Sequence, residues 1–200
     1  MSGTSTPYGL IPQSDQVGTI RPLRIPAGIA SGLASNIFKY QPVKMAVATG
    51  TITPCTATTD QIFGVFQGVE YTPSVNGRPI VSNYWPASAT WTNTADMFVY
   101  IWPAWVPGMR FAIQADGAVA QALLGSGFNF TTANLSSGST TTGFSQCTVI
   151  AAGVAASTQA QLALVEFYTG LNSTIGDAFT DLIVSIAYPQ IVTGYQTSIG

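Results

Sequence analysis

The two carboxylates best placed to act together are Asp177 and Asp181, which are four residues apart. On a helix this spacing puts both side chains on one face, where paired carboxylates perform acid–base catalysis or bind a hard cation. Gly176 precedes the first carboxylate, however, and the second leads into the apolar run 182–186, a pattern that predicts a turn entering a strand. We therefore interpret Asp177 as a turn-capping residue and not as a ligand.

Other catalytic constellations lack a necessary member. The chain has no histidine, so a serine nucleophile would have no imidazole base, and the commonest metal ligand is missing as well. Lys39 or Lys44 could replace such a base, but neither lies in a supporting motif. The glycine pairs at 64/68 and 125/127 lack the lysine and acidic partner of phosphate-binding loops. We expect no catalytic residue, no metal site and no cofactor, and hence no enzyme.

Charge is scarce and unevenly placed. Asp, Glu, Lys and Arg make up 7% of the 200 residues, whereas about 25% is usual. Residues 1–50 carry four basic and one acidic side chain, a balance of +3, and residues 51–200 carry two basic and seven acidic, a balance of −5. Nucleic-acid binding needs clustered basic residues, so this composition argues against it. A basic N-terminal segment on an acidic body favours docking on an acidic protein surface or on another copy of the chain.

The sequence contains no recognisable signal for export or membrane insertion and no redox motif. The first residues have neither the basic nor the apolar segment of an export signal, and no apolar stretch reaches the ~20 residues that a spanning helix needs. We expect a protein made and assembled in the cytoplasm, without a membrane partner. Cys55 and Cys147 form no CxxC pattern, so reduced thiols are favoured over a disulfide, although their pairing stays open.

Residues 1–36 are predicted to form an extended N-terminal arm, because prolines and glycines recur through them and break any helical period. Residues 19–25 alternate well enough for a short strand, and Pro22 restricts it to a sheet edge. Such an arm cannot bury its own apolar side chains. We therefore expect it to lie against the body or a neighbouring subunit, which would cover Leu10, Ile11, Leu23 and Ile25.

The body, residues 37–200, shows one strand pattern after another and no sustained 3.6-residue apolar period. Turn signals separate the strands, notably Asn76-Gly77, which predicts a type I′ hairpin turn. This spacing predicts an all-β fold, a jelly-roll-like or related β-sandwich or barrel. We expect a loop at 131–143, a helical turn or loop at 154–161, and strands at 43–47, 49–53, 62–71, 79–82, 97–102, 109–114, 119–124, 147–151, 161–168 and 182–187.

The clearest strand pattern covers residues 63–71. Strict alternation would give it an apolar face (63, 65, 67, 69 and 71) and a nearly bare face (64, 66, 68 and 70). The glycines at 64 and 68 indicate a bulge or a close backbone approach. We expect Phe63, Val65 and Val69 in the core, whereas for Phe66 a core position and an interface position remain equally open.

Aromatic residues and prolines gather between residues 84 and 107, where Tyr84, Trp85, Trp91, Trp102 and Trp105 lie. Packing of long loops is the first interpretation of this cluster. A protein contact comes second, because Trp and Tyr are enriched in binding hot spots. A carbohydrate-stacking patch comes third, because few carboxylates and amides lie nearby.

Several stretches together resemble the head decoration, or cement, proteins of tailed bacteriophages. The similarity extends over roughly residues 37–187, leaving out the arm and the 131–143 loop. It is carried by VKM at 43–45, IFGVFQGVEY at 62–71, NGRPIVSNYWP at 76–86, FAIQADG at 111–117 and NSTIGDAFTDLIVSI at 172–186.

This resemblance implies a β-rich structural virion protein on the capsid exterior. Its partners would be the major capsid protein and copies of itself, as a dimer or trimer. The alternative is a host-attachment or glycan-binding module of a phage head or tail fibre. As candidate partner contacts we select Arg21, Arg24, Lys39, Lys44, Phe66, Trp102 and Trp105.

Overall fold

The computed structural model describes residues 4–13, 21–154, 159–169 and 173–190. The predicted all-β class is confirmed, because the longer regular elements are all strands, joined by loops and three short 3-10 helices, η1 (Thr94–Asp96), η2 (Gln121–Leu123) and η3 (Thr132–Asn134). The strands are β1 (Ile11–Gln13), β2 (Leu23–Pro26), β3 (Pro42–Ala46), β4 (Thr51–Pro54), β5 (Gly64–Tyr71), β6 (Ile80–Ser82), β7 (Phe98–Pro103), β8 (Arg110–Gln114), β9 (Gly127–Phe128), β10 (Leu162–Phe167) and β11 (Asp181–Ile186).

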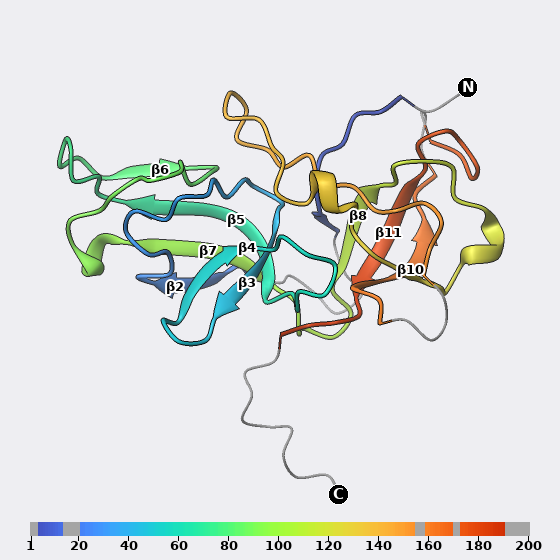
Figure 1. Cartoon of the computed structure of the whole chain (residues 1–200), viewed down its shortest axis with the longest axis horizontal. Coiled ribbons are helices and arrows are strands. Elements are labelled where there is room, and N and C mark those ends of the chain that lie inside the picture. Colours follow the sequence, from blue (N-terminus) through green and yellow to red (C-terminus); the bar gives the residue numbers. More distant parts are fainter. Residues whose placement is uncertain (1–3, 14–20, 155–158, 170–172, 191–200) are drawn as a thin grey trace, which may run out of the picture.

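The strands form two antiparallel sheets, which lie toward opposite ends of the long axis of the molecule (Figure 1). The five-stranded sheet has the order β1-β8-β11-β10-β9. The six-stranded sheet has the order β2-β7-β5-β3-β4, and β6 pairs with the far end of β5. Both ends of the described chain therefore contribute to the first sheet, whereas residues 23–103 build the second.

The six-stranded sheet curls until its two edges approach each other. The N–H of Ile52, on β4, donates to the carbonyl of Gly28, just after β2, over 2.7 Å. The curl encloses an apolar cluster, called here the barrel core. It consists of Ile29, Ile37, Val43, Ile52, Phe63, Phe66, Val69, Tyr71, Trp85, Met97, Val99 and Ile101.

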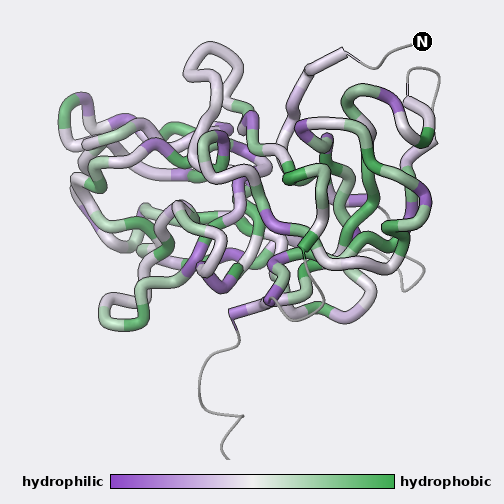
Figure 2. The backbone as a smooth tube through the Cα atoms, turned by 45° about the vertical axis from the view of Figure 1, so that its right-hand side comes forward, coloured by the Kyte–Doolittle hydropathy of each residue, from purple (hydrophilic) through white to green (hydrophobic). Residues whose placement is uncertain are grey.

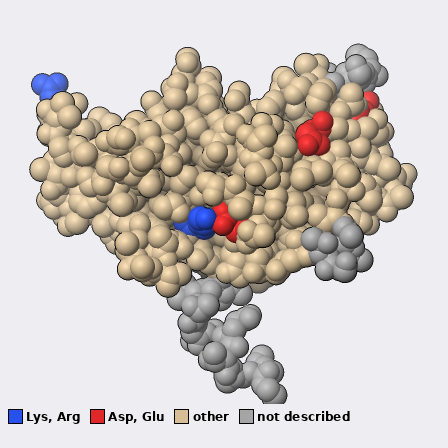
Figure 3. All heavy atoms as spheres, in the orientation of Figure 1, with Lys and Arg blue, Asp and Glu red and all other residues tan. Residues whose placement is uncertain are grey.

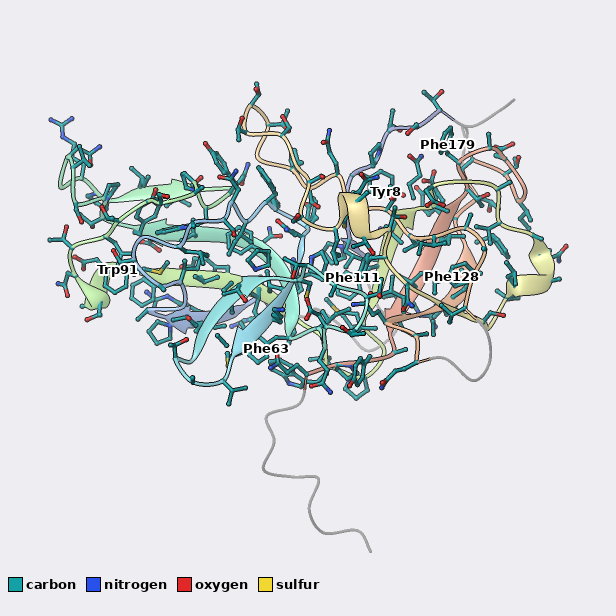
Figure 4. The ribbon with its side chains drawn as sticks, in the orientation of Figure 1. Tyr8, Phe63, Trp91, Phe111, Phe128 and Phe179 are labelled. Atoms are coloured by element: carbon teal, nitrogen blue, oxygen red, sulfur yellow. The ribbon has the colours of Figure 1, made fainter. Side chains whose placement is uncertain are left out.

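A second cluster, the inter-sheet core, covers the five-stranded sheet. Alternate residues of β8 and β11 enter it, namely Phe111, Ile113, Leu182 and Val184. Val65 of the six-stranded sheet belongs to the same cluster, so the two sheets pack against each other through it. Figure 2 shows that hydrophobic residues predominate along several stretches of backbone in the five-stranded half, and Phe111 and Phe128 of this core are labelled in Figure 4.

A bulge in β5 overturns the predicted pattern of two clean faces. The pairing of β5 with β7 shifts register between Phe66 and Gly68, so alternation is interrupted at Gln67. Val65 enters the inter-sheet core, and Phe66 and Val69 enter the barrel core. The expected core positions of Phe63, Val65 and Val69 are confirmed, and so is the close backbone approach at a glycine. A Cβ on Gly64 would lie 2.6 Å from the carbonyl oxygen of Trp102.

The hairpin predicted around Asn76-Gly77 is present, but its turn type was wrongly predicted. β5 pairs with β6 across the turn. A type I′ turn needs positive φ at both central residues, whereas Gly77 has φ +62° and Asn76 is not among the residues with positive φ. The Gly77 N–H instead donates to the carbonyl of Pro73 over 3.0 Å, which closes a wider turn.

The described parts of residues 1–36 pair with both sheets. β1 lies beside β8, and β2 forms the edge of the six-stranded sheet beside β7, as the position of Pro22 predicts. Leu10 is fully buried in the inter-sheet core, whereas Leu23 on β2 stays 38% exposed. Residues 14–20, where the predicted edge strand begins, lie outside the described residues.

Two strand predictions at the C-terminal half are wrong. Residues 119–124 contain η2 in place of a strand, and in residues 147–151 only isolated bridges at Val149 occur. The 131–143 segment is mainly loop, as predicted, with η3 at its start. The helical turn considered at 154–161 falls largely on residues 155–158, outside the described part of the chain.

Candidate functional site

Asp177 and Asp181 do not form a carboxylate pair on a helix. Asp177 lies in the turn before β11 and accepts the Thr174 N–H at 2.9 Å, so the predicted turn-capping role is confirmed. This hydrogen bond lowers the pKa of Asp177 below its ordinary value. Asp181 begins β11 and accepts the hydroxyl of Tyr8 at 3.0 Å and the Gln114 amide at 3.4 Å.

These contacts hold the N-terminal segment on the five-stranded sheet. Tyr8 lies above β8 near the start of β11 (Figure 4), and Gln114 Oε1 accepts the Thr6 N–H at 2.8 Å. Burial, together with the neighbouring Asp181 carboxylate, raises the pKa of Tyr8 far above its ordinary value. The phenol thus stays protonated and donates to Asp181, which is a structural role.

The two cysteines are buried free thiols, as favoured from the sequence. Burial raises the pKa of Cys147 to about 12 and raises that of Cys55 as well. Because the thiolate is the reactive form, neither sulfur has the chemistry of a nucleophile.

Neither metal ligation nor membrane spanning has a counterpart in the described residues. Within residues 4–13, 21–154, 159–169 and 173–190, no three Cys, Asp or Glu side chains gather as a metal site would require. The same part of the chain contains no helix with the length and apolarity to cross a bilayer.

The four basic candidates do not gather in one place. Arg24 lies on β2 and Lys44 on β3, with β7 and β5 between those strands. Lys44 forms an ion pair with Asp60 at 2.7 Å, and Lys39 lies over the rings of Tyr40 and Phe144. Arg21 is exposed just before β2.

The three apolar candidates also differ in their surroundings. Phe66 is fully buried in the barrel core, so its selection as a partner contact is corrected: in the folded chain this ring has no exposed surface. Trp105 is 38% exposed and packs on Phe63 with ring centroids 4.9 Å apart. Trp102 is partly buried and packs on the inter-sheet core.

On the side of β7 that faces away from the barrel core, Trp102 lies in a row with other aromatic residues. Those residues were not among the contacts predicted from the sequence. Val99 and Ile101 of β7 point into the barrel core, whereas Phe98, Tyr100 and Trp102 alternate with them and remain partly exposed. The signal for this row was present in the sequence, since residues 98–102 alternate aromatic and aliphatic side chains.

Polar groups fix the aromatic row from both neighbouring strands. The guanidinium of Arg24 lies over the Phe98 ring, 3.3 Å from its centre, and Tyr100 donates to Glu70 at 3.1 Å. Trp102 donates to Gln67 at 2.9 Å. We call the surface formed by Arg24, Gln67, Glu70, Phe98, Tyr100 and Trp102 the β7 outer face.

A shallow hollow of about 310 Å³ adjoins this face near the β5–β6 hairpin. Its lining residues are Glu70, Thr72, Gly77, Pro79, Asp96 and Phe98. It therefore combines one aromatic ring with two carboxylates. The arrangement suits an aromatic contact surface with pre-positioned polar groups.

Comparison with known proteins gives no relative to which this chain can be assigned: no family model, no curated protein and no solved structure matches it.

Proposed function

We propose that this chain is a structural virion protein, a decoration or cement subunit that binds the outside of a tailed-phage head. It would stabilise contacts between major capsid proteins and lie beside copies of itself. The jelly-roll-like topology and the extended arm expected from the sequence belong to the same proposal. The coarser fold, two packed antiparallel sheets, is compatible with it.

The observation that carries the proposal is the chemistry of the β7 outer face. Protein contacts are enriched in Tyr, Trp, Phe and Arg and depleted of Lys, Glu and Asp at their centres. Phe98, Tyr100 and Trp102 are partly exposed in one row, and Arg24 covers the first of them. Their hydrogen bonds to side chains of β5 hold two of these rings before any partner arrives, which reduces the entropy lost on binding.

Several carboxylates hold parts of the fold together, which also supports a structural role. Asp60 accepts two backbone N–H groups and pairs with Lys44, and Asp116 accepts the Thr131 hydroxyl and the Ala151 N–H. Asp177 and Asp181 bind their own turn and the N-terminal segment. Few charges therefore remain to be desolvated when a large neutral surface is covered.

A glycan-binding module is the second candidate, because the hollow beside the β7 outer face joins Phe98 to the carboxylates of Glu70 and Asp96. Sugars bind through stacking on aromatic rings and hydrogen bonds to acidic groups. Replacing Phe98, the ring that lines the hollow, by alanine and measuring adsorption to cells or polysaccharide separates the two candidates. The decoration role predicts no change in adsorption.

The direct experiment measures binding of the purified chain to phage heads that lack it, by co-sedimentation. We expect saturable binding that the double substitution Phe98→Ala and Tyr100→Ala weakens at least about tenfold. Leu124→Ala, at a residue 53% exposed far from this face, is the matched control and should bind like the wild type.

The outcomes have separate meanings. No binding of the wild-type chain would contradict the decoration role itself. Binding that is insensitive to the double substitution would leave that role intact and exclude the β7 outer face as the contact.

A further inference from the structure

The hollow at the β5–β6 hairpin is lined by acidic and aromatic groups, and the one basic residue of the hairpin stays outside it. Its lining includes the carboxylates of Glu70 and Asp96 and the ring of Phe98. The residues on both sides of Arg78 line it as well, but Arg78 itself does not. The hollow therefore has the character of a site for a cationic side chain, because carboxylates and aromatic faces both attract a guanidinium.

Arg78 and Asp96 are charged groups at the same end of the molecule that do not pair with each other. Both are exposed, and neither forms an ion pair with any described residue. Figure 3 shows a basic side chain projecting from the end of the molecule that holds β6, with no acidic side chain beside it on that face. Glu70 differs from Asp96, because it already accepts the hydroxyl of Tyr100. A cation and an anion of the hairpin region thus remain available to a partner.

The two groups lie on opposite sides of this end. Arg78 belongs to the turn between β5 and β6, whereas Asp96 ends η1, which leads into β7. Because β6 and β7 pair with β5 from its two sides, the hairpin turn and η1 are separated across the width of the sheet. Figure 1 shows both at one end of the long axis, the hairpin beside the label β6 and η1 at the start of β7.

Exposed apolar side chains accompany these charges. Val81 faces Glu70 across the β5–β6 pair, and Glu70 faces Phe98 across the β5–β7 pair, so the three side chains lie on one face. Val81 is 81% exposed, and Val75, in the hairpin turn, is 93% exposed. Covering them supplies the hydrophobic part of a contact. We call the surface formed by Val75, Arg78, Val81 and Asp96 the hairpin end.

We infer that two copies of this chain form a two-fold symmetric dimer through their hairpin ends, in which Arg78 of each copy enters the hollow of the other and pairs with its Asp96. A two-fold contact requires that one patch carry both complementary groups, so that the pair forms twice. The hairpin end meets this requirement, because its cation and its anion lie on opposite sides of one surface. Arg24, which covers Phe98, and Arg78 together balance Glu70 and Asp96, so two such ends meet without net repulsion.

The inference deepens the part of the proposed function that places copies side by side, and in that respect it rests on the proposed function. The dimer itself is measurable without capsids. Tyr100 and Trp102 lie further along β7 from the hairpin end and stay available to a capsid protein. Arg78 and Asp96 are not members of the β7 outer face, so substitutions at these two residues test the dimer separately from capsid binding.

The test is sedimentation velocity of the full chain over a series of protein concentrations. The weight-average sedimentation coefficient should rise with concentration and level off at the value of a dimer. Arg78→Glu should weaken the dimer at least about tenfold, because it places like charges in contact at both symmetric positions. Arg21→Glu, the same change of charge at an exposed arginine before β2, is the matched control and should dimerise like the wild type.

A charge exchange between two variants identifies the partner residue. Asp96→Lys alone should weaken the dimer as Arg78→Glu does. An equimolar mixture of the two variants should regain it, because the new acidic group of one variant then faces the new basic group of the other, and the second pair is native. Circular dichroism should show that each variant is folded.

A chain that stays monomeric at every concentration would overturn the inference. A dimer that Arg78→Glu leaves intact, a mixture of the two variants that stays monomeric, and association that continues beyond two copies would each overturn it as well. Binding to phage heads is a separate readout. A monomer that still binds heads contradicts only the two-fold contact, and a dimer that does not bind heads contradicts only the decoration role.

Discussion

The guanidinium of Arg24 covers the ring of Phe98 although the two residues are not directly opposite each other in the sheet. Arg24 faces Tyr100 across the β2–β7 pair, and Phe98 faces Pro26. The contact therefore runs diagonally and joins the edge strand β2 to the aromatic row of β7. A cation held this close to a ring contributes about 0.5–1 kcal/mol at an exposed site.

A double-mutant cycle with Arg24→Ala and Phe98→Ala should yield a coupling of about 0.5–1 kcal/mol in the free energy of unfolding, measured by urea denaturation. Strictly additive effects of the two substitutions would show that the ring and the guanidinium do not interact in solution.

Replacing Tyr8 by phenylalanine should lower the free energy of unfolding by about 1.5–3 kcal/mol, because the phenol donates to the charged Asp181 across 173 residues of sequence. Urea denaturation measures this loss. Tyr168→Phe, at a tyrosine that is 43% exposed in the same half of the molecule, is the matched control and should change stability little. Equal stability of Tyr8→Phe and wild type would contradict the assigned hydrogen bond.

The contribution of Asp60 to the free energy of unfolding should decrease as the pH is lowered. Partial burial alone would raise the pKa of Asp60, but the Lys44 ammonium and the N–H groups of Thr56 and Ala57 hold it below its ordinary value. A carboxyl whose pKa is lowered by folding stabilises fully above its unfolded pKa, about 3.9, and loses that effect as the pH falls through the lower folded value.

The difference in unfolding free energy between wild type and Asp60→Asn should therefore be constant from pH 8 to about pH 5 and shrink below it. Denaturation at several pH values measures this difference. A difference that grows on acidification would contradict the ion-pair geometry.

Gly64→Ala should destabilise the fold by about 2 kcal/mol or more, because the added Cβ would lie 2.6 Å from the carbonyl oxygen of Trp102, a backbone atom. Gly50→Ala is the comparison: that residue has φ +66° and open space around its Cβ position, so only the backbone penalty of roughly 1 kcal/mol applies. Thermal denaturation of both variants should rank Gly64→Ala as clearly the less stable.

Neither cysteine should react with a thiol reagent in the native protein at pH 8, because burial keeps both thiols protonated and inaccessible. Both should react at once in denaturant. Rapid native labelling of Cys55 or Cys147 would show that the inter-sheet core opens far more easily than its packing indicates.

Local pattern in the sequence predicted much of the sheet and little of the site. The strands at 62–71, 97–102, 109–114, 161–168 and 182–187 carry alternating or β-branched residues, and each of these segments contains a strand. Strict alternation could not predict the bulge at Gln67. The extra residue reverses the faces after it, so Val69 lies in the barrel core with Phe66 and not in the inter-sheet core with Val65.

The contacts that define the candidate surface depend on strand order, which leaves no local trace. Tyr100 meets Glu70 and Trp102 meets Gln67 only because β7 lies beside β5. Similarly, Lys44 was selected as a partner contact from charge alone, whereas folding brings Asp60 to it. The sequence shows that a residue is charged, but tertiary packing decides which group forms an ion pair with it.

The most direct test of the proposed function is cryo-electron microscopy of intact phage particles that contain this chain. We predict density for the two-sheet fold on the outer surface of the head, with the β7 outer face against the major capsid protein. Particles whose shells lack this density, with the chain found only in a tail fibre or absent from the virion, would contradict the proposal.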